Sequence, residues 1–125
     1  MTGFSITFAE SSKEMTAKER IKMKDTSNAV KIDEVTNNGE QLVITPDAYA
    51  ILNVHNERSD NPDYHSYVII DKDGTKYYTG SEPFWSSFKE IWDDMCGENE
   101  EYSVLCYKKD SKNYKGKQFL TCSIV

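Results

Sequence analysis

A lysine-rich segment near the C-terminus is the part of the sequence best suited to hold a ligand. Residues 108–117 read KKDSKNYKGK, with five lysines against one acid, so the local charge is +4. Lysines can hold phosphates while an aromatic ring between them stacks on an unpaired base. The candidate residues here are Lys108, Lys109, Lys112, Tyr114, Lys115 and Lys117. We interpret the segment as a nucleic-acid contact, and the alternative is a solvated hairpin tip.

Aromatic residues on predicted strands are the second set of candidates. Side chains alternate between the faces of a strand, so Phe119 shares a face with Thr121 and Ser123. Leu120 and Cys122 fall on the opposite face. Phe119 is therefore predicted to be an apolar ring on a polar, exposed face, where it can stack on a base. The other candidate stacking residues are Tyr107, Tyr67 and one of the adjacent pair Tyr77 and Tyr78. The alternative for each is ordinary strand propensity.

The aromatic residues of the predicted helix 82–95 are interpreted as core. Phe84, Phe88, Ile91, Trp92 and Met95 repeat at intervals of three and four residues, as on the apolar side of a helix. A base-stacking role for these rings and for the neighbouring Trp85 is the less favoured alternative, because a small domain needs this apolar area for its core.

Residues that do enzyme chemistry are sparse, and we expect neither catalysis nor a cofactor. No phosphate-binding glycine loop, paired-cysteine motif or nucleophile motif is present. A zinc site built from His55, His65 and a cysteine is an alternative that we do not favour. Cys106 and Cys122 are expected to lie opposite each other on neighbouring strands, as small core residues.

Composition limits the remaining possibilities. The chain has 125 residues, which suits one domain. Its net charge of -6 argues against a protein that reads duplex DNA with a basic surface. No apolar run approaches the roughly 18 residues of a membrane span, and the N-terminal residues lack the pattern of a secretory signal. Three cysteines are too few for a disulfide framework, so we expect a cytoplasmic, reduced protein.

The elements that position these residues are mostly strands. Strands are predicted at 29–35, 42–44, 49–55, 67–70, 75–79, 102–107 and 117–125, with turns at 37–39 and 72–74 and a proline interruption at 46. One helix, at about 82–95, precedes the last two strands. This order predicts a mainly β domain over 29–125, an OB-fold-like Greek-key barrel of five or six strands with one helix. Residues 108–117 would then be the loop that lines the oligonucleotide groove of such a barrel.

Residues 1–28 are expected to form an N-terminal arm, partly extended or mobile, that adds little to the core. Thr16 and Glu19 have the spacing of a capping box before one or two helical turns. Phe4, Ile6 and Phe8 alternate with polar residues, which suits an edge strand on the same barrel or on a neighbouring subunit. The arm is therefore a candidate contact in a homo-oligomer.

Two stretches of the sequence resemble a known family. TGSEPFWSSFKEI at 79–91 and SKNYKGKQFLTC at 111–122 are similar to the small single-stranded-DNA-binding proteins of bacteriophages and mobile elements of Gram-positive bacteria. The resemblance extends over about 21–125. It implies an OB-fold, no catalysis, and the coating of single strands in phage replication or recombination, with replication or recombination proteins as further partners. Such proteins often confine acid to a flexible tail, whereas this chain is acidic overall and ends in a predicted strand.

The sequence therefore predicts a protein that binds single-stranded DNA with little sequence preference. The rival hypothesis is an acidic interaction protein of phage type that inhibits a host nucleic-acid enzyme by mimicry. It rests on the net charge of -6 and on residues 93–101, which carry five acids and no base. A small metal-dependent enzyme is the remaining alternative.

Overall fold

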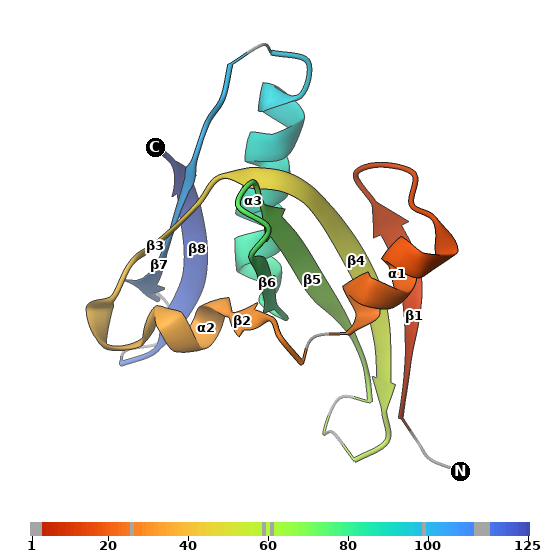
Figure 1. Cartoon of the computed structure of the whole chain (residues 1–125). Helices are drawn as coiled ribbons and strands as arrows, with labels where there is room; N and C mark the ends of the chain where they lie inside the picture. Colours follow the sequence, from red (N-terminus) through yellow and green to blue (C-terminus); the bar gives the residue numbers. More distant parts are fainter. Residues whose placement is uncertain (1–3, 26, 59, 61, 99, 112–115) are drawn as a thin grey trace. The chain divides into compact units, whose positions relative to one another are not determined.

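The computed structural model describes residues 4–25, 27–58, 60, 62–98, 100–111 and 116–125. Figure 1 shows the helices and strands in chain order. They are β1 (Phe4–Ser11), α1 (Ala17–Lys24), β2 (Val30–Lys31), α2 (Ile32–Val35), the 3-10 helix η1 (Asn37–Gly39), β3 (Leu42–Ile44), β4 (Pro46–Asn56), β5 (Asp63–Asp71), β6 (Lys76–Thr79), α3 (Glu82–Met95), β7 (Val104–Asp110) and β8 (Gln118–Ile124).

The fold is mainly β with one main helix, as expected, and its strands form two sheets. One sheet has the strand order β1-β4-β5-β6-β2 and the other has the order β3-β7-β8. Among the described residues these pairings do not close a barrel, so the barrel itself stays a prediction. The chain divides into two compact units. The first contains residues 1–30 and 47–80, and the second contains residues 31–46 and 81–125. The boundary expected at residue 28 does not coincide with this division.

The first unit is built on the long antiparallel pairing of β1 with β4. Seven residue pairs join the two strands, from Phe4 opposite Asn56 to Ser11 opposite Ala50, with an irregularity between Phe8 and Glu10. A buried cluster of Met23, Ala50, Leu52 and Val68 packs on this sheet, with Ile6, Phe8, Met15, Ile70 and Tyr78 around it. The N-terminal segment thus supplies an edge strand and part of a core. The edge strand expected from Phe4, Ile6 and Phe8 is confirmed. The contribution to the core differs from the expectation, because it depends on pairing with residues 39 to 52 positions away and leaves no local signal in the sequence.

Both ends of α1 are fixed by specific hydrogen bonds. At the N-terminus, the Thr16 hydroxyl accepts from the Glu19 amide at 3.2 Å and the Glu19 carboxylate accepts from the Thr16 amide at 3.1 Å. The predicted capping box is confirmed. At the C-terminus, the Lys76 ammonium of β6 donates to the carbonyls of Lys22 and Asp25. The Lys22 carbonyl also accepts from the Asp25 amide at 3.3 Å, so backbone and side-chain donors together close this end of the helix.

The predicted hairpin between β5 and β6 is also confirmed. Its turn places Gly74 at a φ of 94°, where glycine is favoured because it has no Cβ. The Gly74 amide donates to the Asp71 carbonyl at 2.8 Å, and the Asp73 carboxylate accepts from the Thr75 amide at 2.8 Å. Turn chemistry that acts over four residues is visible in the sequence, so the turn could be predicted from it.

The strand predicted at 29–35 is wrong over most of its length. The chain forms only the two-residue β2 and then turns into α2 and η1. Ile32 and Thr36 are fully buried and lie four residues apart, which suits a helical turn, and the Thr36 hydroxyl donates to the Ile32 carbonyl at 2.9 Å. The apolar spacing in this stretch fits both the two-residue period of a strand and the 3.6-residue period of a helix. The chain forms the helix because that conformation buries Ile32 and Thr36 together.

The second unit has α3 packed along β8 (Figure 1). Ser81 caps the helix by accepting from the Phe84 amide at 3.2 Å. Phe84, Trp85 and Phe88 are buried, and the ring of Phe88 lies 5.3 Å from that of Trp85, centroid to centroid. The interpretation of these helix aromatics as core is confirmed. Among the described residues, no helix is both long enough and apolar enough to cross a membrane.

Candidate nucleic-acid interface

The candidate interface is one face of the three-stranded sheet β3-β7-β8, which lies entirely within the second unit. In an antiparallel sheet, directly opposed residues share a face. The register pairs Val43 with Leu105 between β3 and β7, and it pairs β7 with β8 residue by residue. We define the outer sheet face as the set Val43, Leu105, Tyr107, Lys109, Phe119, Thr121 and Ser123.

The opposite face of this sheet is core, which fixes the orientation of the outer one. Val104 and Cys106 of β7 are fully buried. Ile44 of β3 and Leu120 and Cys122 of β8 are also buried, each with only a few per cent of its surface exposed. Cys106 lies opposite Cys122, as predicted, and both thiols are free. Burial raises the pKa of the Cys122 thiol to about 12, and it raises the pKa of Cys106 further still, so neither is a reactive thiolate.

Phe119 and Lys109 lie on the outer sheet face near the end of the β7–β8 ladder. They are directly opposed across β8 and β7. The Lys109 side chain is exposed and Phe119 is half-buried, so the ring keeps accessible surface beside an ammonium group. If a base stacked on the Phe119 ring, the neighbouring phosphate of the strand would lie close to the Lys109 ammonium. This pairing of ring and cation is the arrangement used for single strands.

Tyr107 extends the outer sheet face by a second ring. It lies opposite Thr121, but its hydroxyl hydrogen-bonds the hydroxyl of Ser123 at 2.9 Å, two residues along β8. A tyrosine that reaches a diagonal neighbour lies across the sheet, so the bond holds the half-buried ring along the surface. Tyr107 and Phe119 therefore offer two rings on one face, within two residues of each other in register.

Two further residues of the outer sheet face were not predicted from the sequence. Val43 is 53% exposed, and Leu105 opposite it is half-buried, so together they add apolar surface next to the rings. Strand alternation within Leu42–Ile44 places Val43 on the other face from its two neighbours, but it does not show which face is exposed.

Thr121 is the covered residue of the outer sheet face. It is 9% exposed, and its hydroxyl lies 3.3 Å from that of Ser87 on α3.

Charged residues gather at the end of the sheet where β7 and β8 meet the lysine-rich segment. Lys109 and Lys117 are exposed, while the Lys108 ammonium donates to the side chain of Asn37. Asp110 accepts from the Gln118 amide group at 3.0 Å. Three predicted contacts, Lys112, Tyr114 and Lys115, lie outside the described residues.

The remaining two sequence candidates belong to the first unit, and one of them must be withdrawn. Tyr67 is 2% exposed and its hydroxyl lies 3.4 Å from His65 Nδ1, so its ring has no open face on which a base can stack. The prediction failed because a tyrosine in a strand gives the same sequence signal whether its face is buried or exposed. Tyr77 is half-buried opposite Ile69 on β6 and β5, and it belongs to the first unit, whereas the outer sheet face belongs to the second.

The histidines considered for zinc have other surroundings. His55 Nδ1 lies 2.6 Å from Asp63 Oδ1, and its Nε2 lies 3.6 Å from Glu57. The hydrogen bond to Asp63 raises the pKa of His55. Within the part of the chain that the structure describes, no three His, Cys, Asp or Glu side chains are grouped as a metal site would require.

Comparison with known proteins adds no relative. No protein-family model, curated protein or solved structure matches the chain.

Proposed function

We propose that the chain binds single-stranded DNA through the outer sheet face, with little sequence preference. The observation that carries the proposal is the opposed pair Phe119 and Lys109, with Tyr107 as a second ring on the same face. Rings stack on any base and ammonium groups follow the backbone, so this arrangement favours single strands without reading their sequence. Lys117, and the lysines of the segment 112–115, would extend the contact along the backbone.

The proposal includes the biological setting that the resemblance implies. The protein would coat single strands during replication or recombination of a phage or mobile element. A relation to the OB-fold is part of the same proposal. It is supported by the position of α3, which follows β6 and precedes the β7–β8 hairpin as in that fold.

The experiment is a set of anisotropy titrations with a labelled oligothymidylate, a duplex and a single-stranded RNA, each at two salt concentrations. We expect tight binding to the DNA single strand that weakens as salt rises. The Lys109→Gln/Lys117→Gln variant should bind more weakly, and the slope of log affinity against log salt should shrink by about 0.7 for each phosphate that the variant no longer neutralises. Arg58→Gln, which removes an exposed charge from the first unit, is the control and should leave the slope unchanged.

The acidic interaction protein is the second candidate, and one observation favours it. The five acids Asp93, Asp94, Glu98, Glu100 and Glu101 are all exposed at the end of α3 and after it, and an ion pair from Lys89 reaches Asp93 at 2.6 Å. A surface of this charge suits an enzyme that normally grips phosphates. If the wild-type protein binds none of the three nucleic acids at low salt, the proposal for the outer sheet face is wrong and this second candidate takes its place.

A further inference from the structure

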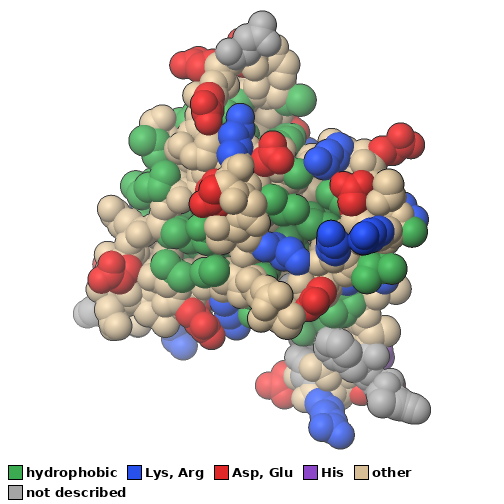
Figure 2. Space-filling model, in the orientation of Figure 1, with side chains coloured by type: hydrophobic (Ala, Val, Ile, Leu, Met, Phe, Trp, Pro, Cys, Tyr) green, Lys and Arg blue, Asp and Glu red, His purple; other side chains and the backbone are tan. Residues whose placement is uncertain are grey.

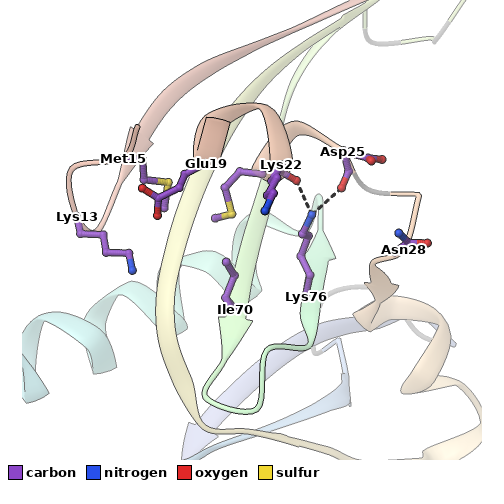
Figure 3. Close-up of a pocket in the computed structure, with 9 residues that line it drawn as sticks. Lys13, Met15, Glu19, Lys22, Asp25, Asn28, Ile70 and Lys76 are labelled. Atoms are coloured by element: carbon purple, nitrogen blue, oxygen red, sulfur yellow. Dashed lines mark hydrogen bonds between the residues drawn. The ribbon is translucent and has the colours of Figure 1, made fainter. Parts of the chain in front are cut away.

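A cavity in the first unit has the composition of a binding site and lies outside the outer sheet face. Its volume is about 510 Å³, within the range of pockets that hold small molecules. Figure 3 shows Lys13 extending from the loop before α1 on one side, Lys76 rising from β6 toward the end of α1 on the other, and Ile70 of β5 between them.

The floor of the cavity is apolar. It is formed by Met15 of the loop before α1, Met23 of α1 and Ile70 of β5. Met23 is buried, while the other two side chains are half-buried and keep part of their surface open. Three side chains from separate segments form this floor, and a flat ring can contact all three of them at once. Thioethers also make favourable contacts with aromatic rings.

The rim of the cavity is positively charged. Lys13, Lys22 and Lys76 reach it from the loop before α1, from α1 and from β6. The Lys76 ammonium donates to the carbonyl oxygens of Lys22 and Asp25, the latter at 2.8 Å. These bonds hold the ammonium in place at the C-terminal end of α1.

The two carboxylates that line the cavity already have partners on their own segments. Glu19 accepts from the Thr16 amide as part of the capping box. Asp25 accepts from the Ser27 hydroxyl at 2.7 Å and from the Ser27 amide at 3.0 Å. These hydrogen bonds lower the pKa of each carboxyl. The charges of Lys13 and Lys22 near Glu19, and of Lys76 near Asp25, lower these pKa values further, so the carboxylates offset part of the rim charge. Three lysines against two carboxylates leave the rim a net charge of +1 toward an incoming anion.

The surroundings of the cavity also favour an anion. Between residues 13 and 24 there are five cationic and two acidic side chains, in a chain whose net charge is -6. Figure 2 shows Lys and Arg side chains gathered over α1. Such a local field attracts anions to the cavity from solution.

We propose that this cavity binds a nucleoside monophosphate, with the base on the methionine floor and the phosphate among the rim lysines. A phosphate has three terminal oxygens and close to two charges, so lysines from several directions can share it. The ligand is either a free nucleotide or the 5′-phosphorylated end of a strand, which carries the same chemistry. The site is independent of the outer sheet face.

The test uses the full chain with carbon-13-labelled methionine methyl groups, observed by NMR. Titration with thymidine monophosphate should shift the methyl signals of Met15 and Met23, while Met95 on α3 serves as an internal control. Thymidine and inorganic phosphate alone should each bind at least about tenfold more weakly. A strand end is a source of the ligand if a 5′-phosphorylated trinucleotide moves these signals and its 5′-hydroxyl form does not. If only the free nucleotide moves them, the source is the free nucleotide.

A matched pair of variants separates a built site from general attraction. Lys13→Gln/Lys22→Gln should raise the dissociation constant at least about tenfold. Lys18→Gln removes an exposed charge from α1 that does not line the cavity, and should leave the constant unchanged. The proposal is overturned if neither methyl moves at about 10 mM nucleotide, if Lys18→Gln weakens binding as much as the double variant, or if octanoate produces the same shifts at equal or lower concentration.

Discussion

Replacing Phe119 by alanine separates stacking from packing on β8. The ring is half-buried on the outer sheet face, opposite an exposed lysine, so its removal takes away one stacking surface and little core. Base stacking on an aromatic side chain is worth about 1–3 kcal/mol by alanine substitution, which is roughly 5- to 150-fold in the dissociation constant. We expect that decrease in affinity for oligothymidylate, with a small change in stability.

Phe88 on α3 supplies the opposite case. It is 1% exposed, and its ring lies 5.3 to 6.1 Å from those of Trp85, Phe84 and Trp92, centroid to centroid. Deleting a buried phenylalanine costs about 3–5 kcal/mol, a large part of the roughly 5–15 kcal/mol that stabilises a domain. Phe88→Ala should therefore unfold readily, and its binding should be close to wild type under conditions where it stays folded.

The assays are urea melts followed by tryptophan fluorescence and anisotropy titrations with the labelled strand. Tyr64→Ala is the control, because it deletes an exposed aromatic ring, 39% accessible, from the first unit. It should change neither stability nor affinity appreciably. The assignment of the two faces of β8 is refuted if Phe119→Ala binds like the wild type, or if it melts as early as Phe88→Ala.

Three more outcomes follow from the first unit and the cysteines. A thiol reagent should modify the exposed Cys96 in the native protein and all three cysteines in denaturant; fast native modification of either sheet cysteine would contradict their burial. Since Asp63 raises the pKa of His55 above its ordinary 6.5, the stabilisation is complete below about pH 6.5 and is lost as pH rises through the folded pKa. In thermal melts, His55→Gln should accordingly cost most at acidic pH and least at alkaline pH; a pH-independent difference would count against the pair. Removing residues 1–11 should lower the melting temperature by at least about 5 °C, because β4 loses one of its two neighbouring strands, and an unchanged melt would show that β1 adds no stability.

Local signals explain which elements the sequence predicts correctly. The predicted helix at 82–95 matches α3, because Ser81 caps it and its apolar spacing agrees with its burial. The alternation that placed Phe119 and Leu120 on opposite faces of the strand agrees with the register of β8. Both signals act within a few residues, and each agrees with the packing that the chain finally adopts.

Long-range contacts explain the failures. Nothing near Tyr67 in the sequence distinguishes a buried ring from an exposed one, because its burial depends on the elements packed over its face. The pairing of β1 with β4 likewise depends on residues more than 35 positions apart. The sequence did not predict that Val43 is exposed, because its exposure depends on which face of β3 turns toward the core. That face becomes defined only when β3 pairs with β7.

The interleaved division of the chain has a consequence for folding during synthesis. The first unit needs nothing beyond Gly80, so it can form while the ribosome is still adding residues. Residues 31–46 emerge earlier than much of that unit but belong to the second one, and their apolar side chains Ile32 and Ile44 are buried only in the finished fold. β3 pairs with β7, which is made about 60 residues later. In the nascent chain this segment is therefore the stretch most exposed to chaperones, to proteases and to association with other nascent chains.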